Sequence, residues 1–195
     1  FSDIMTDRPR VFILLWFGFI FIAFAALMSI GHAAGIATYY GIPADQAYWG
    51  PMLSNLIYIG FALSAGILCD LITGRRVLIG IAAVMAVPLL VLYFVPSAGM
   101  SLVALALVGG AFGASSSAYP VTVTGYYGVA ALPRIYGRLS SSFGLAGLLG
   151  PFAAGVLYDW KSGYNVAILI AGILATIGVF TVWALPKNRA PTTAE

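Results

Sequence analysis

His32 is the side chain in this sequence best suited to proton chemistry, and it is the single histidine. It lies inside a long apolar run, where an ionisable group is costly and usually faces a protein interior. An imidazole with an ordinary pKa of about 6.5 can carry a proton or hold an anion. Gly31 and Gly35 flank it at a spacing that favours close helix contact. A neutral imidazole bonded to a neighbouring helix is therefore an equal alternative.

Three further polar side chains are candidates for binding a substrate. Asn55 and Tyr58 are three residues apart, so they share one face of a helix. They can hydrogen-bond a ligand in a cavity, or they can satisfy each other or the backbone. Tyr119 precedes Pro120 in a stretch of small residues, which predicts a bent or bending helix with Tyr119 as a substrate contact. A static kink in a packing helix is the alternative.

A short cluster of charged residues follows the second apolar run, and such a cluster can hold a protein in one conformation. Asp70 lies at the end of an apolar run, and Arg75 and Arg76 follow it. An aspartate at such a place attracts a cation or caps an adjacent helix. We predict that these residues, together with Asp159, form a conformational latch. The alternative is a solvated loop whose arginines only set the topology.

The sequence predicts neither covalent catalysis nor a bound cofactor or metal. One cysteine and one histidine cannot build a metal cluster. Nucleotide-binding motifs such as G-x-G-x-x-G after a strand, or a Walker loop, are absent. An intramembrane serine protease needs G-x-S-G and a later histidine, whereas residues 113–116 read Gly-Ala-Ser-Ser and His32 precedes them. We therefore predict that the protein is not an enzyme.

The elements that must position these side chains are membrane-spanning helices. The chain has 195 residues, of which 62% are hydrophobic and 8% charged. Soluble domains are typically about 25% charged, so a soluble enzyme is excluded. A bilayer core of about 30 Å needs about 20 helical residues. Cutting the sequence at its charges and its Pro and Gly clusters predicts six all-α spans: Val11–Ala37, Tyr48–Ile72, Val77–Val95, Met100–Val123, Tyr136–Tyr158 and Val166–Leu185.

The basic residues predict how these spans are oriented. Basic residues occur before the first span, after the second, between the fourth and fifth, and after the sixth. In a chain with six spans, these four places all lie on one face of the membrane. Lys161 is the exception. The positive-inside rule then places both termini in the cytoplasm, in a plasma membrane such as the bacterial inner membrane. This rule explains the net charge of +3 without a nucleic-acid partner.

An internal repeat divides the predicted spans into two sets of three. Residues 66–74 and 155–163 both read G-[IV]-L-x-D-x-x-x-G, each at the exit of the middle helix of a set but on opposite membrane faces. Inverted three-helix repeats are typical of secondary transporters. We predict a cytoplasmic segment 1–10, repeats 11–95 and 96–185, and a cytoplasmic tail 186–195. Coincidence is the alternative, since G-x-L strings are common in membrane helices.

Two stretches resemble a known transporter family. Residues 66–76 resemble the G-x-L-x-D-R-x-G-R-R loop motif of the major facilitator superfamily, with one residue inserted before Gly74 and a leucine after Asp70. A second set is similar to the tenth-to-twelfth helix region of the oxalate/formate antiporter and monocarboxylate transporter families. It consists of Tyr126-Tyr127-Gly128, Ile135-Tyr136-Gly137-Arg138, Gly147-Leu148-Leu149-Gly150-Pro151, Gly155-Val156-Leu157-Tyr158-Asp159 and Gly163-Tyr164.

The resemblance implies that these six helices are the C-terminal half of a major facilitator fold. It implies secondary active transport of a small organic anion such as a monocarboxylate by alternating access, with substrate held between this bundle and a second six-helix bundle. Proton symport and exchange both remain open. The oxalate carriers keep a lysine where residues 140–143 read Ser-Ser-Ser-Phe, which argues against an oxalate-like dianion. A second hypothesis is a non-transporting six-helix subunit that acts as a scaffold or assembly partner, and a third is a half-size carrier that homodimerises.

Overall fold

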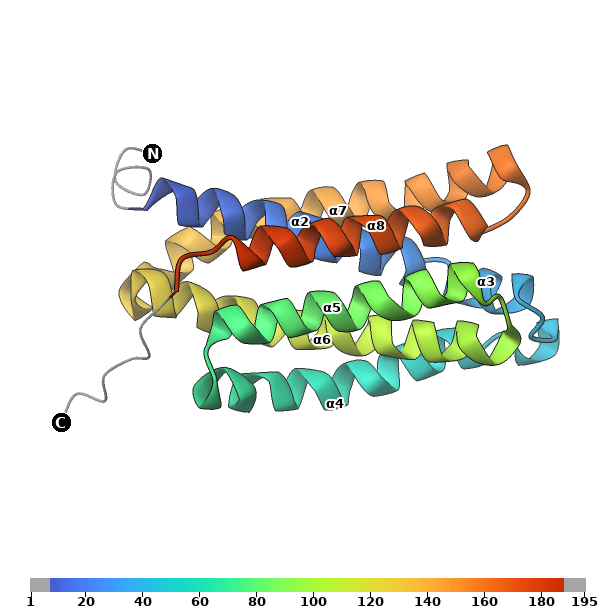
Figure 1. Cartoon of the computed structure of the whole chain (residues 1–195), viewed down its shortest axis with the longest axis horizontal. Helices are drawn as coiled ribbons and strands as arrows, with labels where there is room; N and C mark the ends of the chain where they lie inside the picture. The colour runs from blue at the N-terminus through green and yellow to red at the C-terminus, as the bar shows by residue number, and fades with distance from the viewer. Residues whose placement is uncertain (1–7, 188–195) are drawn as a thin grey trace.

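The computed structural model describes residues 8–187 as an elongated helical bundle, with six helices long and apolar enough to cross a membrane (Figure 1). The α-helices are α2 (Pro9–Ile30), α3 (Ala33–Tyr39), α4 (Trp49–Leu71), α5 (Gly74–Phe94), α6 (Ala98–Tyr127), α7 (Leu132–Lys161) and α8 (Asn165–Trp183), with two 3-10 turns, η1 (Ala44–Gln46) and η2 (Val129–Ala131). The prediction of an all-α protein with six spans is confirmed. Residues 1–7 and 188–195, within the predicted terminal segments, lie outside the described residues.

The first predicted span differs from the structure at its outer end. We expected one helix over Val11–Ala37, but α2 ends at Ile30 and the short helix α3 begins at Ala33. His32 between them has φ −117° and ψ 21°, outside the helical region. Its side chain bonds to two residues of the second half of the chain, Pro151 and Tyr164. Hydropathy cannot detect this break, because the residues on either side of it are apolar.

The helices pair across the two predicted repeats rather than within them. The middle helix α4 of the first repeat packs on α6, and the middle helix α7 of the second packs on α2. The third helices follow the same rule, since α5 packs on α6, α8 packs on α2, and the two contact each other. Exchanging the two sets of three helices leaves this pattern unchanged. The bundle is thus built from two inverted three-helix units, as predicted from the sequence.

Two glycines of α6 bring its backbone directly onto α4. A Cβ built on Gly109 would lie 2.6 Å from the Cα of Ser54, and one built on Gly113 would lie 2.9 Å from the Cα of Tyr58. The Ser54 hydroxyl crosses the same contact and donates to the Leu105 carbonyl at 3.0 Å. Small residues and interhelical hydrogen bonds are the means by which helices associate in lipid.

The pseudosymmetric pair, α2 with α7, also makes a close approach through a glycine. A Cβ on Gly150 would lie 3.1 Å from the backbone nitrogen of Met28 and 3.3 Å from the Phe24 carbonyl. One turn further along α2, a Cβ on Gly31 would lie 3.1 Å from the ring of Pro151. Both contacts between repeats therefore depend on glycine, although Gly109 and Gly113 lie on the first helix of a repeat and Gly150 lies on a middle helix.

Replacing Gly109 with alanine should destabilise the bundle by about 1–3 kcal/mol, because α4 and α6 must separate to admit the methyl group. The matched control is Gly80→Ala on α5, where a Cβ would meet nothing within 4 Å. Alanine is the better helix former, so we expect this control to be neutral or stabilising by up to about 1 kcal/mol. Denaturant titration of both variants in detergent checks the prediction. Equal stabilities would contradict the close approach.

Candidate functional site

A cavity of about 180 Å³ opens between the first two helices of each repeat. Phe19 of α2 and Phe112 of α6 each lie about halfway along their helices, which places the cavity near the middle of the bundle. Its lining residues come from α2, α4, α6 and α7: Phe19, Tyr58, Phe112, Ser115, Ser116, Tyr136, Ser140 and Phe143. A site shared by four helices of both repeats is where a transporter of inverted repeats binds substrate.

The polar surface of this cavity consists of hydroxyl groups. The Tyr58 hydroxyl donates to Ser116 Oγ at 3.3 Å, and Ser116 Oγ donates to the Gly113 carbonyl at 2.7 Å. Ser140 likewise donates to the carbonyl of Tyr136, at 2.9 Å. The serines direct their protons to their own helices, so the donors left for a ligand are the Tyr136 phenol and, once it gives up its long contact with Ser116, the Tyr58 phenol. An anion in this cavity would be held by Tyr58 and Tyr136.

Aromatic rings form the rest of the cavity wall and place Tyr119 behind it. The Phe19 ring stacks on the Tyr119 ring with centroids 4.2 Å apart, while Phe112 stacks on Phe143 at 6.1 Å. Tyr119 is fully buried, and its hydroxyl has no hydrogen-bond partner among residues 8–187. The structure therefore places Tyr119 one layer below the cavity surface, with Phe19 in between.

Asn55, predicted beside Tyr58, lies on the exposed surface of α4. Its side-chain amide donates to the Pro51 carbonyl of the same helix at 2.9 Å. It does not line the cavity that Tyr58 enters.

His32 follows the end of α2, near the end of the bundle where α7 gives way to α8, and it joins the two repeats there. Its Nε2 is 3.0 Å from the Pro151 carbonyl, and its Nδ1 is 3.1 Å from the Tyr164 hydroxyl. A carbonyl only accepts, so Nε2 carries a proton, and in the neutral imidazole Nδ1 accepts from the phenol. Burial raises the pKa of Tyr164, and Tyr158 and Asp159 act in the same direction, so this phenol keeps its proton. The contacts match the helix-bonding alternative for His32.

Three of the four residues predicted as a latch, Asp70, Arg75 and Arg76, lie around the turn between α4 and α5. Asp70 is exposed in the last turn of α4, and within residues 8–187 no salt bridge joins it to Arg75 or Arg76. Arg75 instead donates to the Trp183 carbonyl at 2.5 Å, where the C-terminal end of α8 favours a cation. Thr73 precedes α5 with φ +127°, a strained conformation for a β-branched residue.

Asp159 is exposed in the last turn of α7, at the opposite end of the bundle from Asp70. The two aspartates thus occupy equivalent places in the two repeats, on opposite membrane faces. Groups of three or more potential metal ligands do not occur within residues 8–187.

Comparison with known proteins identifies the family. The sequence pattern of the Major Facilitator Superfamily matches residues 13–195. The chain belongs to this superfamily. It is also similar to human monocarboxylate transporter 14, with 26% identity over an alignment of 197 positions that covers 96% of this chain and 37% of that protein. The chain therefore spans little more than a third of the length of this relative.

For a major facilitator half, the structure adds site residues that the sequence did not single out. Tyr136 and Ser140 lie four residues apart on one face of α7, and Ser116 lies opposite them on α6. The sequence shows that Tyr136 and Ser140 share a face of α7, but it does not show that this face turns toward the cavity, because that depends on how α7 packs on α2.

We expect His32→Ala to lower the free energy of unfolding by about 1–3 kcal/mol. The Pro151 carbonyl and the Tyr164 hydroxyl both lose their hydrogen-bond partner when the imidazole is removed. Tyr164→Phe should cost less, and the double variant should cost less than the sum, since both changes break the same hydrogen bond. Thermal unfolding of the three variants in detergent measures these differences. Additive effects would contradict the His32–Tyr164 contact.

Proposed function

We propose that this chain is the C-terminal half of a secondary active transporter that moves a small organic anion, such as a monocarboxylate, by alternating access. The observation that carries the proposal is the hydroxyl-lined cavity shared by α2, α4, α6 and α7. Superfamily membership and the similarity to a monocarboxylate transporter support it. Binding and release through hydrogen bonds need no covalent chemistry, so we do not propose an enzyme.

The chemistry of the cavity favours a singly charged substrate. Two phenols supply hydrogen-bond donors, and neither lysine nor arginine is among the lining residues. A dianion would enter this half of the site without a compensating cation, which is costly in a medium of low dielectric constant. A monocarboxylate loses less hydration and can be shared with donors from the second bundle. Whether a proton accompanies it is set by groups outside this chain's cavity.

We propose that a second six-helix bundle covers the faces of α4 and α7. Within each span we compare the buried share of an 18-residue apolar segment. That share is 17% for the span of α4 and 28% for that of α7, whereas it is half or more for α2, α5 and α6. These two helices occupy equivalent places in the two repeats, so the bundle presents them together at the edges of the cavity. The exposed aliphatic residues Leu56, Ile59 and Leu63 on α4 fit such a contact.

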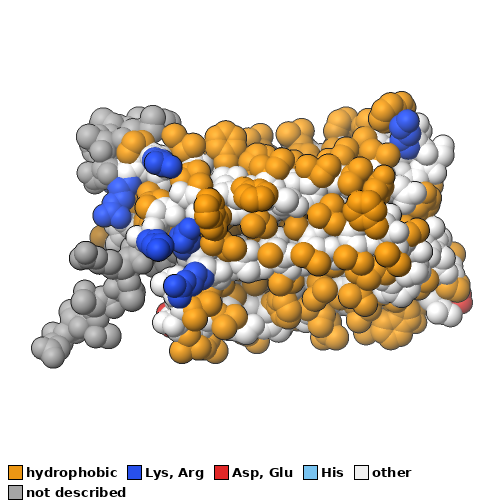
Figure 2. Space-filling model, in the orientation of Figure 1, with side chains coloured by type: hydrophobic (Ala, Val, Ile, Leu, Met, Phe, Trp, Pro, Cys, Tyr) orange, Lys and Arg blue, Asp and Glu red, His pale blue; other side chains and the backbone are white. Residues whose placement is uncertain are grey.

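The distribution of charge supports the proposed orientation. Lysine and arginine side chains gather at the end of the bundle where α2 begins and α8 ends, and basic colour at the other end is confined to one corner of this view (Figure 2). Lys161 closes α7 at that other end. By the positive-inside rule, the end with the cationic cluster faces the cytoplasm.

Removing either cavity phenol should weaken transport. We expect Tyr58→Phe and Tyr136→Phe each to raise KM by about tenfold or more, because a hydrogen bond to a charged group contributes about 1.5–3 kcal/mol. Uptake of radiolabelled monocarboxylates into proteoliposomes containing the full-length protein measures this effect.

The matched control is Tyr93→Phe, which removes a phenol from α5 outside the cavity and should leave KM unchanged. If all three variants transport alike, the cavity is not the substrate site. Flat uptake for every small carboxylate by the correctly folded wild type would instead favour the scaffold hypothesis.

Asp70→Asn tests the proposed latch. Asp70 is exposed and unpaired within residues 8–187, so we propose that its partner belongs to the second bundle. Neutralising it should slow turnover several-fold with little change in KM, because the lost contact differs between conformations rather than between substrates. Kinetic analysis of uptake separates the two parameters. A large rise in KM with normal turnover would contradict the latch.

A further inference from the structure

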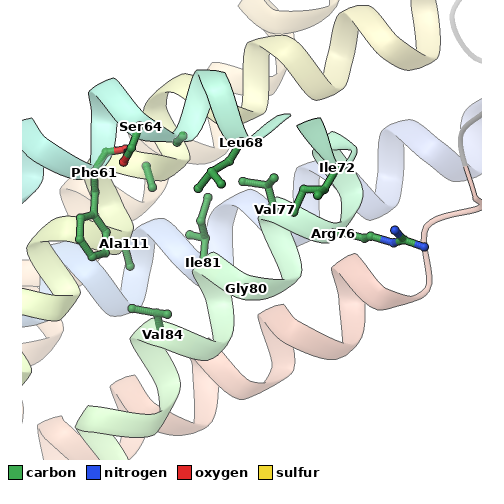
Figure 3. Close-up of a pocket in the computed structure, with 12 residues that line it drawn as sticks. Phe61, Ser64, Leu68, Ile72, Arg76, Val77, Gly80, Ile81, Val84 and Ala111 are labelled. Atoms are coloured by element: carbon green, nitrogen blue, oxygen red, sulfur yellow. The ribbon is translucent and has the colours of Figure 1, made fainter. Parts of the chain in front are cut away.

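A second and larger hollow lies outside the candidate transport site. It is a groove of about 360 Å³ between α4 and α5, with α6 as its floor (Figure 3). Its lining residues are Phe61, Ser64, Ala65, Leu68, Ile72, Arg76, Val77, Gly80, Ile81, Val84, Ala111 and Ala114. The Ser64 hydroxyl donates to the carbonyls of Gly60 and Phe61 on its own helix, so it makes no demand on a ligand. The groove is thus an apolar channel with one cation at its end.

Small side chains keep this groove open. α4 and α5 are consecutive, yet they make far fewer contacts with each other than each makes with α6. Gly80 faces open space, since a Cβ there would meet nothing within 4 Å, and the floor on α6 is made of Ala111 and Ala114. A groove on the membrane-facing surface is filled either by lipid or by another protein segment, so this groove has an occupant.

The dimensions of the groove match one leaflet of a bilayer. Along α5 it runs from Arg76, beside the turn after α4, to Val84. Eight helical residues rise roughly 12 Å, which approaches the half-thickness of roughly 15 Å of a hydrocarbon core. The groove thus begins at headgroup depth and ends close to the middle of the membrane.

The end of the groove at headgroup depth is positively charged. Arg76 also lines a separate pocket of about 140 Å³ together with Thr73, Arg75 and Lys187, so its lining has three cations, while Asp70 in the last turn of α4 is not part of that lining. Figure 3 shows the Arg76 side chain extending from the groove toward this end. The Nε of Arg75 is buried and has no hydrogen-bond partner among residues 8–187. Clusters of basic residues at this depth attract anionic lipid headgroups.

We propose that the groove binds an anionic phospholipid of the adjacent leaflet. One acyl chain lies along α4 and α5 against Ala111 and Ala114, and the phosphate lies among Arg75, Arg76 and Lys187. A helix of a second bundle would fill the apolar groove, but it would match the cationic pocket only if it also placed a carboxylate there. A free phosphate would fill the pocket but not the groove. The phospholipid is the occupant that matches both, and it does not depend on which substrate is transported.

The test is photolabelling of the full-length protein in proteoliposomes. The probes are phosphatidylglycerol and phosphatidylcholine that carry the same diazirine-labelled acyl chain, and labelled peptides are mapped. We expect phosphatidylglycerol to label residues 61–72 and 77–84 more strongly than phosphatidylcholine does. Arg76→Gln should reduce that preference about fivefold. Gly80→Leu should reduce labelling by both lipids, because a Cβ at position 80 meets nothing within 4 Å and the rest of the side chain would extend into the groove.

Two matched controls separate this site from general effects. Lys161→Gln removes a cation at the other end of the bundle, and Val87→Leu enlarges an exposed residue of α5 outside the groove. Neither should change the labelling. The proposal is overturned if the two lipids label equally in the wild type, if Gly80→Leu leaves the groove labelled, or if inorganic phosphate abolishes the preference while acyl labelling persists. A photoreactive residue at position 84 that cross-links to the second bundle rather than to lipid would also overturn it.

Discussion

Backbone contact between helices of opposite repeats is the constraint on which the rest of this bundle depends. Lipid chains are as apolar as leucine, so helices in a membrane gain little from burying large side chains against each other. They associate where small residues let two backbones approach. Gly109 and Gly113 of α6 do so against α4, and Gly150 of α7 does so against α2. These contacts fix the axes of four helices, and the positions of the other helices follow.

The cavity is a consequence of the same geometry. Where Gly113 holds α6 against the backbone of Tyr58, the Tyr58 side chain is directed past Ser116 into the space between the helix pairs. The aromatic rings of Phe19 and Phe143 then limit that space from the α2 and α7 side. α5 and α8 contribute nothing to its lining, because they contact the outer faces of α6 and α2. A change in the α4–α6 distance would therefore alter the cavity before it altered the periphery.

Sequence reasoning succeeded where the determining physics is local. Hydropathy located five of the six spans to within four residues at each end, although it missed the break at His32 in the first, and the repeated G-[IV]-L-x-D motif indicated the inverted pairing. Packing between distant segments was not predictable in this way. Tyr119 is separated from the cavity by Phe19, a hundred residues earlier, and His32 meets partners that lie more than a hundred residues later. Nearness in sequence also misleads, since Arg75 bonds to α8 rather than to Asp70.

The interlocked pairing of the two repeats bears on how the chain is made. The helices of the first repeat have their main contacts with α6, α7 and α8, all of which are synthesised later. While the ribosome is still adding these helices, α4 is already in the membrane without α6. The Ser54 hydroxyl then lacks its acceptor on α6, the Leu105 carbonyl, and the backbone around Ser54 lacks its contact with Gly109. Assembly thus has to wait until nearly the whole half has entered the membrane. During this interval, insertion factors and quality-control proteases have access to the incompletely assembled chain. Substitutions that impair α6 should therefore lower the yield of the protein before they lower its activity.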